Sequence, residues 1–190
     1  MLGPSFAFQF CMIGTAGGLA ALGGLSVAIL MWIPALIAFG MRIFGGEGFA
    51  DVGFRAGPWR FWLWAYLAPI VLASFTYGLA LLVGAVSFDP RPSAVDYASP
   101  ALRWLVGSVL VNLTLGVFIA NLVSLGEELG WRGYLLTRLV EAKLPAPLVL
   151  GGVIWGVWHL PLILWGDYST SSRPWLSALL FMIVVTLAGV

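Results

Sequence analysis

Charged side chains are scarce in this sequence, and their scarcity decides the class of protein. Only 9% of the 190 residues are Asp, Glu, Lys or Arg, whereas soluble domains carry about a quarter of such residues. The first charged side chain is Arg42, and 61% of the residues are hydrophobic. An ordinary soluble fold is therefore excluded. The long apolar runs predict an all-α, polytopic integral membrane protein, because helices satisfy their own backbone polar groups in lipid.

Cysteine, histidine and basic patches are equally rare. Cys11 is the one cysteine, which excludes an internal disulfide and a multi-thiolate metal site. His159 is the one histidine, so a zinc signature of the HExxH type is excluded as well. The formal net charge is +1, without a basic cluster, and this excludes nucleic acid as a partner. Glycine-rich fingerprints for phosphates or dinucleotides are absent.

The uncharged N-terminal region is too long for one membrane span. At about 1.5 Å per residue, residues 5–40 would reach about 54 Å as one helix, and a hydrocarbon core is about 30 Å thick. We therefore expect two helices there, or one span with a shallow or broken helix. The predicted break points are Gly17-Gly18, Gly23-Gly24 and Pro34.

Four further apolar segments follow, which gives about five to six membrane helices in total. They form one integral membrane domain, 1–190, with a motif-bearing core at 101–190. The sequence stops inside its last apolar segment, so we expect the chain to be truncated at its C-terminus. The predicted segments are 61–86, 102–125, 148–165 and 175–190, and the linkers are 42–60, 86–101, 126–147 and 166–174.

The basic residues are unevenly shared among the linkers. Linkers 42–60 and 126–147 carry six of them, against three in and beside the alternate linkers. Because cytoplasmic loops are enriched in Lys and Arg, the first pair of linkers is predicted to be cytoplasmic. The six are Arg42, Arg55, Arg60, Arg132, Arg138 and Lys143; the three are Arg91, Arg103 and Arg173.

Two adjacent carboxylates, Glu127 and Glu128, stand out beside the apolar segments. Carboxylates at membrane depth are energetically expensive, which makes such a pair a functional-site hypothesis. Glu128 and Arg132 are four residues apart, so on a helix they would form an ion pair, a structural reading as strong as a functional one. Glu127 has no cation at that spacing. We therefore take Glu127 as the better candidate for a general acid or base.

His159 lies in a second apolar segment, four residues after Trp155, so their rings would lie close together on a helix. A lone histidine in such a segment is more often a hydrogen-bonded core residue than a catalyst. Pro161 changes that weighting, because a proline disturbs the helix, and an irregular helix at membrane depth indicates a cavity or a site.

Pairs of glycines at helical spacing accompany both motifs. Gly126 and Gly130 flank the glutamates, and Gly152 and Gly156 precede the histidine. Small residues four apart let helix backbones approach closely in lipid. This pattern predicts that the glutamate segment and the histidine segment lie near each other.

Glu127–Arg132, with the sequence EELGWR, resembles the EExxxR signature of the CAAX prenyl protease 2 type family, also called CPBP or Abi intramembrane metalloproteases. Trp155–Pro161, with the sequence WGVWHLP, resembles the second signature of that family, an aromatic residue followed four positions later by histidine. Trp155 stands where phenylalanine is usual. The two motifs with their flanks cover residues 121–165.

The resemblance implies a membrane-embedded endopeptidase with its site in a helical cavity. Glu127 would activate a water with assistance from His159, while Glu128, also carried over as catalytic, supports the site with Arg132 and Trp155. A divalent metal such as zinc, held by Glu127, Glu128 and His159, and a metal-free glutamate mechanism are both left open. The implied partners are the lipid bilayer and a peptide or protein substrate, either prenylated or of bacteriocin type. From the compact, Trp- and Gly-rich spans we expect the location to be a bacterial cytoplasmic membrane.

The family has a further signature, HxxxN or HxxxD, which requires a second histidine and is missing from these 190 residues. We therefore expect this chain to be inactive or severely impaired. Two other functions stay open: a non-catalytic membrane binding or bacteriocin-immunity protein, and a proton-coupled transporter. The transporter would require inverted repeats, which the sequence does not show.

Overall fold

The structure is a computed structural model that describes residues 1–18, 24–87, 109–166, 168 and 171–188. All regular elements among these residues are helices, which confirms the all-α prediction. Four stretches are long and apolar enough to cross a membrane, and two shorter apolar helices accompany them, so the chain is an integral membrane protein. The four are α2 (Gly24–Gly45), α3 (Trp59–Leu82), the helical stretch Asn112–Glu141 and α7 (Pro147–Leu164); the two are α1 (Leu2–Ile13) and α8 (Pro174–Ala188).

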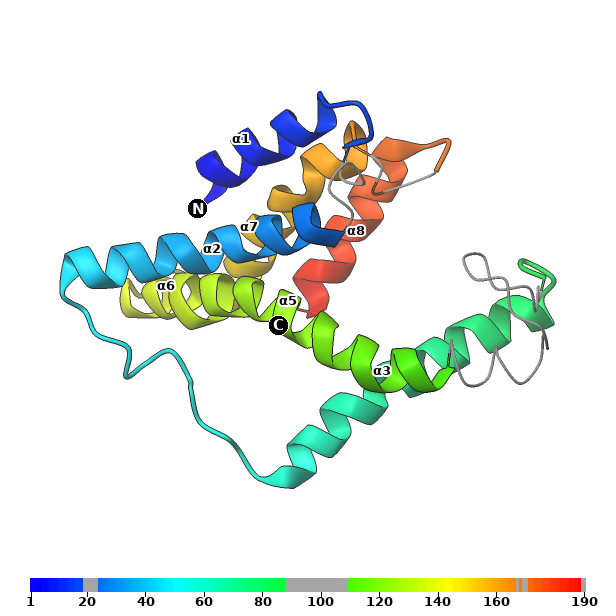
Figure 1. Cartoon of the computed structure of the whole chain (residues 1–190), viewed down its shortest axis with the longest axis horizontal. Helices are drawn as coiled ribbons and strands as arrows, with labels where there is room; N and C mark the ends of the chain where they lie inside the picture. The colour runs from blue at the N-terminus through cyan, green and yellow to red at the C-terminus, as the bar shows by residue number, and fades with distance from the viewer. Residues whose placement is uncertain (19–23, 88–108, 167, 169–170, 189–190) are drawn as a thin grey trace. The chain divides into compact units, whose positions relative to one another are not determined.

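The chain divides into two compact units, residues 1–53 with 119–190, and residues 54–118. In the first unit, α1 packs on α2 and α7, and α8 packs along α7 (Figure 1). In the second unit, α3 is joined to the short π-helical segment η3 (Asn112–Gly116) by the Tyr66 hydroxyl, which donates a 2.7 Å hydrogen bond to the carbonyl of Leu113. Both motifs lie in the first unit.

The predicted break in the N-terminal region is confirmed. α1 ends at Ile13, and Gly17 and Gly18 follow with φ values of +102° and +52°, which glycine adopts without a steric penalty. Of the second predicted break point, Gly23 lies outside the described residues, and Gly24 begins α2. The third predicted break point is wrong, because Pro34 lies inside α2 and the helix continues through it.

The predicted linker 126–147 is wrong over most of its length. The helical stretch continues from α5 (Val117–Gly130) through the π-helical segment η4 (Trp131–Leu136) into α6, Thr137–Glu141. The charges that suggested a linker are accommodated on the helix itself, because Glu128 and Arg132 pair one turn apart. Of the other predicted linkers, 88–101 lies outside the described residues, as does the beginning of the apolar segment 102–125.

The first glycine pair packs against α2. A Cβ on Gly126 would lie 2.5 Å from the carbonyl oxygen of Met31, and a Cβ on Gly130 would lie 2.3 Å from the Cβ of Pro34. Both distances are below 3.0 Å, which real Cβ atoms essentially never show. Glycine is therefore required at both positions, and it brings the backbone of α5 onto that of α2.

The second glycine pair packs against α8. A Cβ on Gly152 would lie 2.8 Å from the Cα of Thr186, and one on Gly156 would lie 2.4 Å from the sulfur of Met182. The prediction that the glycine faces join the two motif segments is therefore wrong in its partners. The spacing of the glycines predicts that each face approaches a neighbouring helix closely, but which helix that is depends on the packing of the whole bundle.

Aromatic packing joins the motif segments instead. Trp131 of η4 and Trp158 of α7 are 4% and 1% exposed, and their ring centroids lie 6.0 Å apart in an edge-to-face arrangement. Gln9 of α1, which is fully buried, donates from its side-chain Nε2 to the carbonyl of Trp158 at 2.9 Å. Gln9 thereby fixes the turn of α7 that leads into His159.

Arg42, near the end of α2, ties the following linker to the motif helix. Its side chain is 1% exposed and donates to both carboxylate oxygens of Asp51, at 2.5 and 3.1 Å. It also donates to the carbonyl of Gly133 in η4 at 2.8 Å. Arg138 of α6 pairs with Asp51 and Glu47 from the same linker. Arg42 and the segment that holds Glu47 and Asp51 therefore lie against η4 and α6.

We expect the Arg42–Asp51 pair to make stability depend on pH. The hydrogen bonds from Arg42 hold the pKa of Asp51 below its usual value of 3.8. A lowered native pKa stabilises the fold above the unfolded-state pKa, and this contribution is lost as pH falls through the native value. Asp51→Asn should lower the melting temperature at pH 7, and its difference from wild type should shrink below about pH 4. Thermal unfolding in detergent measures this; a difference that is constant with pH would contradict it.

Candidate active site

Glu127 is a buried carboxylate at the end of α5. Its side chain is 5% exposed, and its Oε2 accepts a 2.9 Å hydrogen bond from the indole Nε1–H of Trp155 in α7. This bond connects the two sequence motifs directly. It fixes one carboxylate oxygen and leaves Oε1 available to a water or a substrate.

Glu128 occupies a different environment. Its side chain is 50% exposed, and its Oε1 accepts a 2.6 Å hydrogen bond from Nη1 of Arg132, which confirms the predicted ion pair. The guanidinium of Arg132 also lies 4.8 Å from the ring centroid of Trp155, within the range of a cation–π contact. Arg132 thus links Glu128 to the indole that holds Glu127.

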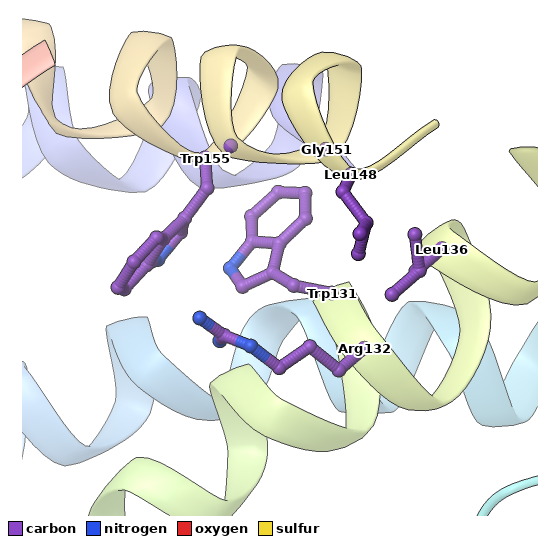
Figure 2. Close-up of a pocket in the computed structure, with 7 residues that line it drawn as sticks. Trp131, Arg132, Leu136, Leu148, Gly151 and Trp155 are labelled. Carbon is purple, nitrogen blue, oxygen red and sulfur yellow. The ribbon is translucent and has the colours of Figure 1, made fainter. Parts of the chain in front are cut away.

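A small pocket lies behind this arrangement, between η4 and α7. Figure 2 shows Trp131 and Arg132 extending from η4 toward Trp155, with Leu148 and Gly151 above them. The pocket has a volume of about 20 Å³, which is room for about one water. It is too small to hold a substrate.

His159 has its ring nitrogen Nδ1 engaged by the backbone of α7. Its Nδ1 lies 3.0 Å from the carbonyl oxygen of Trp155, which can only accept, so Nδ1 carries the proton and Nε2 is the acceptor in the neutral ring. The side chain is 6% exposed. The rings of Trp158 and Phe181 lie 4.6 and 4.7 Å away, centroid to centroid, and restrict its orientation.

A cavity of about 370 Å³ brings these groups together. It contains both glutamates and the histidine among otherwise mostly apolar walls from α2, α5, α7 and α8. Ser124 contributes a hydroxyl one turn before the glutamates, whereas Asn121 is not among the lining residues. The lining residues are Val27, Leu30, Met31, Ser124, Glu127, Glu128, Trp155, Trp158, His159, Leu162, Tyr168 and Phe181.

Tyr168 was missed by the sequence reasoning. Its ring centroid lies 5.8 Å from that of His159 and 5.9 Å from that of Phe181. The residue is 51% exposed; the partial burial of its phenol, followed by the negative charge of Glu127, raises the pKa of Tyr168 above its usual value. The residue falls in a predicted linker, and nothing in the local pattern indicates that it folds back toward His159.

A metal ion does not fit the side chains that the structure describes. No group of three or more His, Cys, Asp or Glu side chains is placed to hold one among the described residues. Of the three residues suggested as ligands, Glu128 forms an ion pair with Arg132. One carboxylate oxygen of Glu127 accepts a hydrogen bond from Trp155. Zinc sites in proteins use three or four ligands, and this set does not supply them.

The substitution Trp155→Phe removes the hydrogen bond to Glu127 but keeps an aromatic face for Arg132. Phenylalanine is also the usual residue at this position in the family that the motif resembles. A hydrogen bond to a charged group contributes roughly 1.5–3 kcal/mol, so the rate of any reaction that depends on Glu127 should fall about tenfold or more. The measurement is the turnover number of the variant beside wild type. An unchanged turnover number would show that the indole N–H does not position Glu127.

The fold and the site together define a helical membrane protein with a buried carboxylate and an imidazole facing one cavity. Residues 108–190, which contain both motifs, match the family described as Rce1-like, type II CAAX prenyl endopeptidase Rce1-like. No curated protein and no solved structure matches the chain. This match agrees with the resemblance of the two motifs to the CAAX endopeptidases, a family of intramembrane proteases.

Proposed function

We propose that this protein is an intramembrane endopeptidase in which Glu127 activates a water for attack on a peptide bond. The observation that carries this proposal is the burial of Glu127 beside His159 in one cavity. The hydrogen bond from Trp155 fixes the orientation of the Glu127 carboxylate, so that its other oxygen can accept a proton from one direction. General-base assistance of this kind contributes about 10²–10⁴-fold to a rate.

The proposed reaction needs only groups of this chain and a water. Glu127 Oε1 takes a proton as the water oxygen bonds to the scissile carbonyl carbon, and the electron pair of the C=O π bond moves to oxygen. His159 Nε2, which is the acceptor when Nδ1–H donates to the carbonyl of Trp155, accepts a hydrogen bond from the second proton of the water. As the tetrahedral intermediate collapses, the C–N bond breaks and the amine leaves with the proton from Glu127. The products are a carboxylic acid and an amine.

Glu128 and Arg132 act through their neighbours in this proposal. Their ion pair places the guanidinium against the Trp155 ring, and the indole in turn holds Glu127. No step passes through a metal, because the described side chains do not group as its ligands. We assign to these two residues the support of the site and not contact with the scissile bond.

The substrate class follows from the walls of the cavity. Apolar side chains surround the reacting groups, which suits a hydrophobic peptide segment or one that carries an isoprenyl group. We propose a prenylated peptide, or a bacteriocin-type peptide, that reaches the site from the bilayer, in a bacterial cytoplasmic membrane. Nucleic acid is not a partner in this proposal, because the chain has no basic cluster.

The test is hydrolysis of an internally quenched S-farnesylated CAAX-type peptide by the purified chain in lipid nanodiscs. We expect slow cleavage after the prenylated cysteine, because the HxxxN/D signature is missing from these residues and one lost oxyanion donor costs about 10²–10³ in rate. Mass spectrometry of the products identifies the bond. Peptide that stays intact in the presence of the wild-type chain, and yet binds, would favour the second function below.

A non-catalytic binding or bacteriocin-immunity protein is the second candidate, and the single histidine is the observation that favours it. Such a protein would bind a peptide in the cavity and would not hydrolyse it. Reading the gene beyond Val190 separates the two proposals. A following apolar segment with His-x-x-x-Asn or His-x-x-x-Asp supports the enzyme, and an immediate stop codon favours binding.

A further inference from the structure

His159 lies in a part of α7 where the regular helical hydrogen bonding is weakened. Pro161 lies inside α7, two residues after His159. Because proline has no backbone N–H, the carbonyl four residues earlier, that of Val157, loses its helical donor, and the proline ring presses against it. The backbone that leads into His159 therefore needs support from outside α7 if the imidazole is to keep one position in the cavity.

Gln9 of α1 supplies such support. Its side-chain Nε2 donates a 2.9 Å hydrogen bond to the carbonyl of Trp158, which is 149 residues away in the sequence. That carbonyl belongs to the planar peptide group whose nitrogen is the backbone nitrogen of His159, so the bond holds the plane from which the His159 side chain departs. Gln9 is not among the residues that line the cavity. Any effect of Gln9 on the reaction therefore passes through α7.

The burial of Gln9 is energetically unfavourable for a residue that only packs two helices together. Its side chain is fully buried, and Oε1 has no hydrogen-bond partner among the described residues. A buried amide costs free energy unless its polar atoms are hydrogen-bonded, so an apolar side chain would join α1 to α7 at lower cost. Polar side chains kept at membrane depth despite this cost are functional candidates. The bond to Trp158 is what the amide of Gln9 adds over an apolar residue.

We propose that Gln9 is a positioning residue for His159, because its hydrogen bond to the carbonyl of Trp158 fixes the turn of α7 that places the imidazole in the cavity with Glu127. This inference rests on the proposed peptidase function. It assigns a part in that function to α1, which lies outside the residues 108–190 that match the family. Without the bond, the turn before Pro161 shifts, and Nε2 of His159 no longer holds the attacking water at a fixed distance from Glu127. The peptide still binds, but the water attacks more slowly.

The single histidine of the chain makes this proposal directly measurable. When histidine is isotopically labelled and the chain is placed in lipid nanodiscs, the imidazole nitrogen resonances come from His159 alone and report the tautomer and the surroundings of its ring. These resonances, the melting temperature and single-turnover hydrolysis of an S-farnesylated CAAX-type peptide at several enzyme concentrations are compared between wild type and variants.

Two variants of Gln9 and one matched control are used. Gln9→Met keeps nearly the length of the side chain but cannot donate a hydrogen bond. Gln9→Asn keeps the amide but is too short by one methylene to reach the carbonyl of Trp158. Ser5→Ala is the control, since Ser5 lies one turn earlier on the same face of α1, is fully buried, and has a hydroxyl without a hydrogen-bond partner among the described residues.

We expect both Gln9 variants to move the imidazole resonances of His159 and to lower the maximal rate by about 10–10²-fold. The half-saturating concentration should not change, and Ser5→Ala should behave as wild type. Unmoved resonances in the Gln9 variants would overturn the inference, and a lower melting temperature alone would make Gln9 a packing residue. Equal movement in Ser5→Ala would also overturn it, because the effect would belong to the packing of α1 as a whole. If the wild-type chain binds the peptide without hydrolysing it and the resonances still move, the peptidase proposal fails and the positioning of His159 by Gln9 stands.

Discussion

Glu127→Gln is expected to abolish peptide hydrolysis, with a fall in turnover of about 10²–10⁴-fold. Glutamine keeps the size of the side chain, and its carbonyl oxygen can still accept the hydrogen bond from Trp155. It cannot take a proton from water at neutral pH, so attack on the carbonyl loses its base. Single-turnover product formation, measured by mass spectrometry with enzyme in excess over peptide, detects even a slow wild-type reaction and gives the ratio.

Two further glutamates provide the comparison. Glu128→Gln breaks the pair with Arg132 on a half-exposed side chain, and we expect a fall in turnover of about tenfold or less, since such pairs contribute little energy. Glu141→Gln alters a carboxylate that pairs with Arg138 away from the cavity, and the rate should not change. A fall for Glu128→Gln as large as that for Glu127→Gln would contradict the division of roles proposed for the two residues.

Gly130→Ala is expected to have the largest effect on stability. The added Cβ would lie 2.3 Å from the Cβ of Pro34 and 2.6 Å from its carbonyl carbon, so α2 and α5 must separate. Overpacking of this kind costs about 1–3 kcal/mol, which lowers the melting temperature by about 2–4 °C per kcal/mol in a protein of this size. Because Gly130 adjoins the motif residues, activity should fall together with stability.

Gly40→Ala is the matched control, since Gly40 lies inside α2 and no atom lies within 4 Å of an added Cβ. Alanine favours a helix over glycine by about 1 kcal/mol, so this substitution should leave stability unchanged or raise it. Thermal unfolding in the same detergent measures both variants. Equal melting temperatures for Gly130→Ala and Gly40→Ala would show that α2 and α5 are not packed backbone to backbone at Gly130.

Several features of the fold could be read from local sequence alone. The deficit of charge and the length of the apolar runs predicted membrane helices, because lipid leaves few alternatives for the backbone. Gly17 and Gly18 marked the first break, which the positive φ angles there explain. The spacing of Glu128 and Arg132 predicted their ion pair, because helical geometry alone brings such residues together.

Other features depended on which helix lies beside which. The glycine pairs predicted close approach, yet their partners, α2 and α8, follow from the packing of the whole unit. Arg42 was taken only as a charge that orients the chain, but it is buried and bound to Gly133, 91 residues away. Gln9 and Tyr168 gave no local signal, because their roles arise from contacts with α7 and His159.

The sequence by itself determined the class of protein, the two motifs and the identity of the glutamates and the histidine, because these depend on composition and on spacing along one helix. Only the tertiary structure decided that Trp155 donates to Glu127 and that Tyr168 lines the same cavity. The physical reason is that hydrogen-bond direction and burial are properties of several helices at once. A periodic pattern specifies which face of a helix is buried, but not which side chain it will meet there.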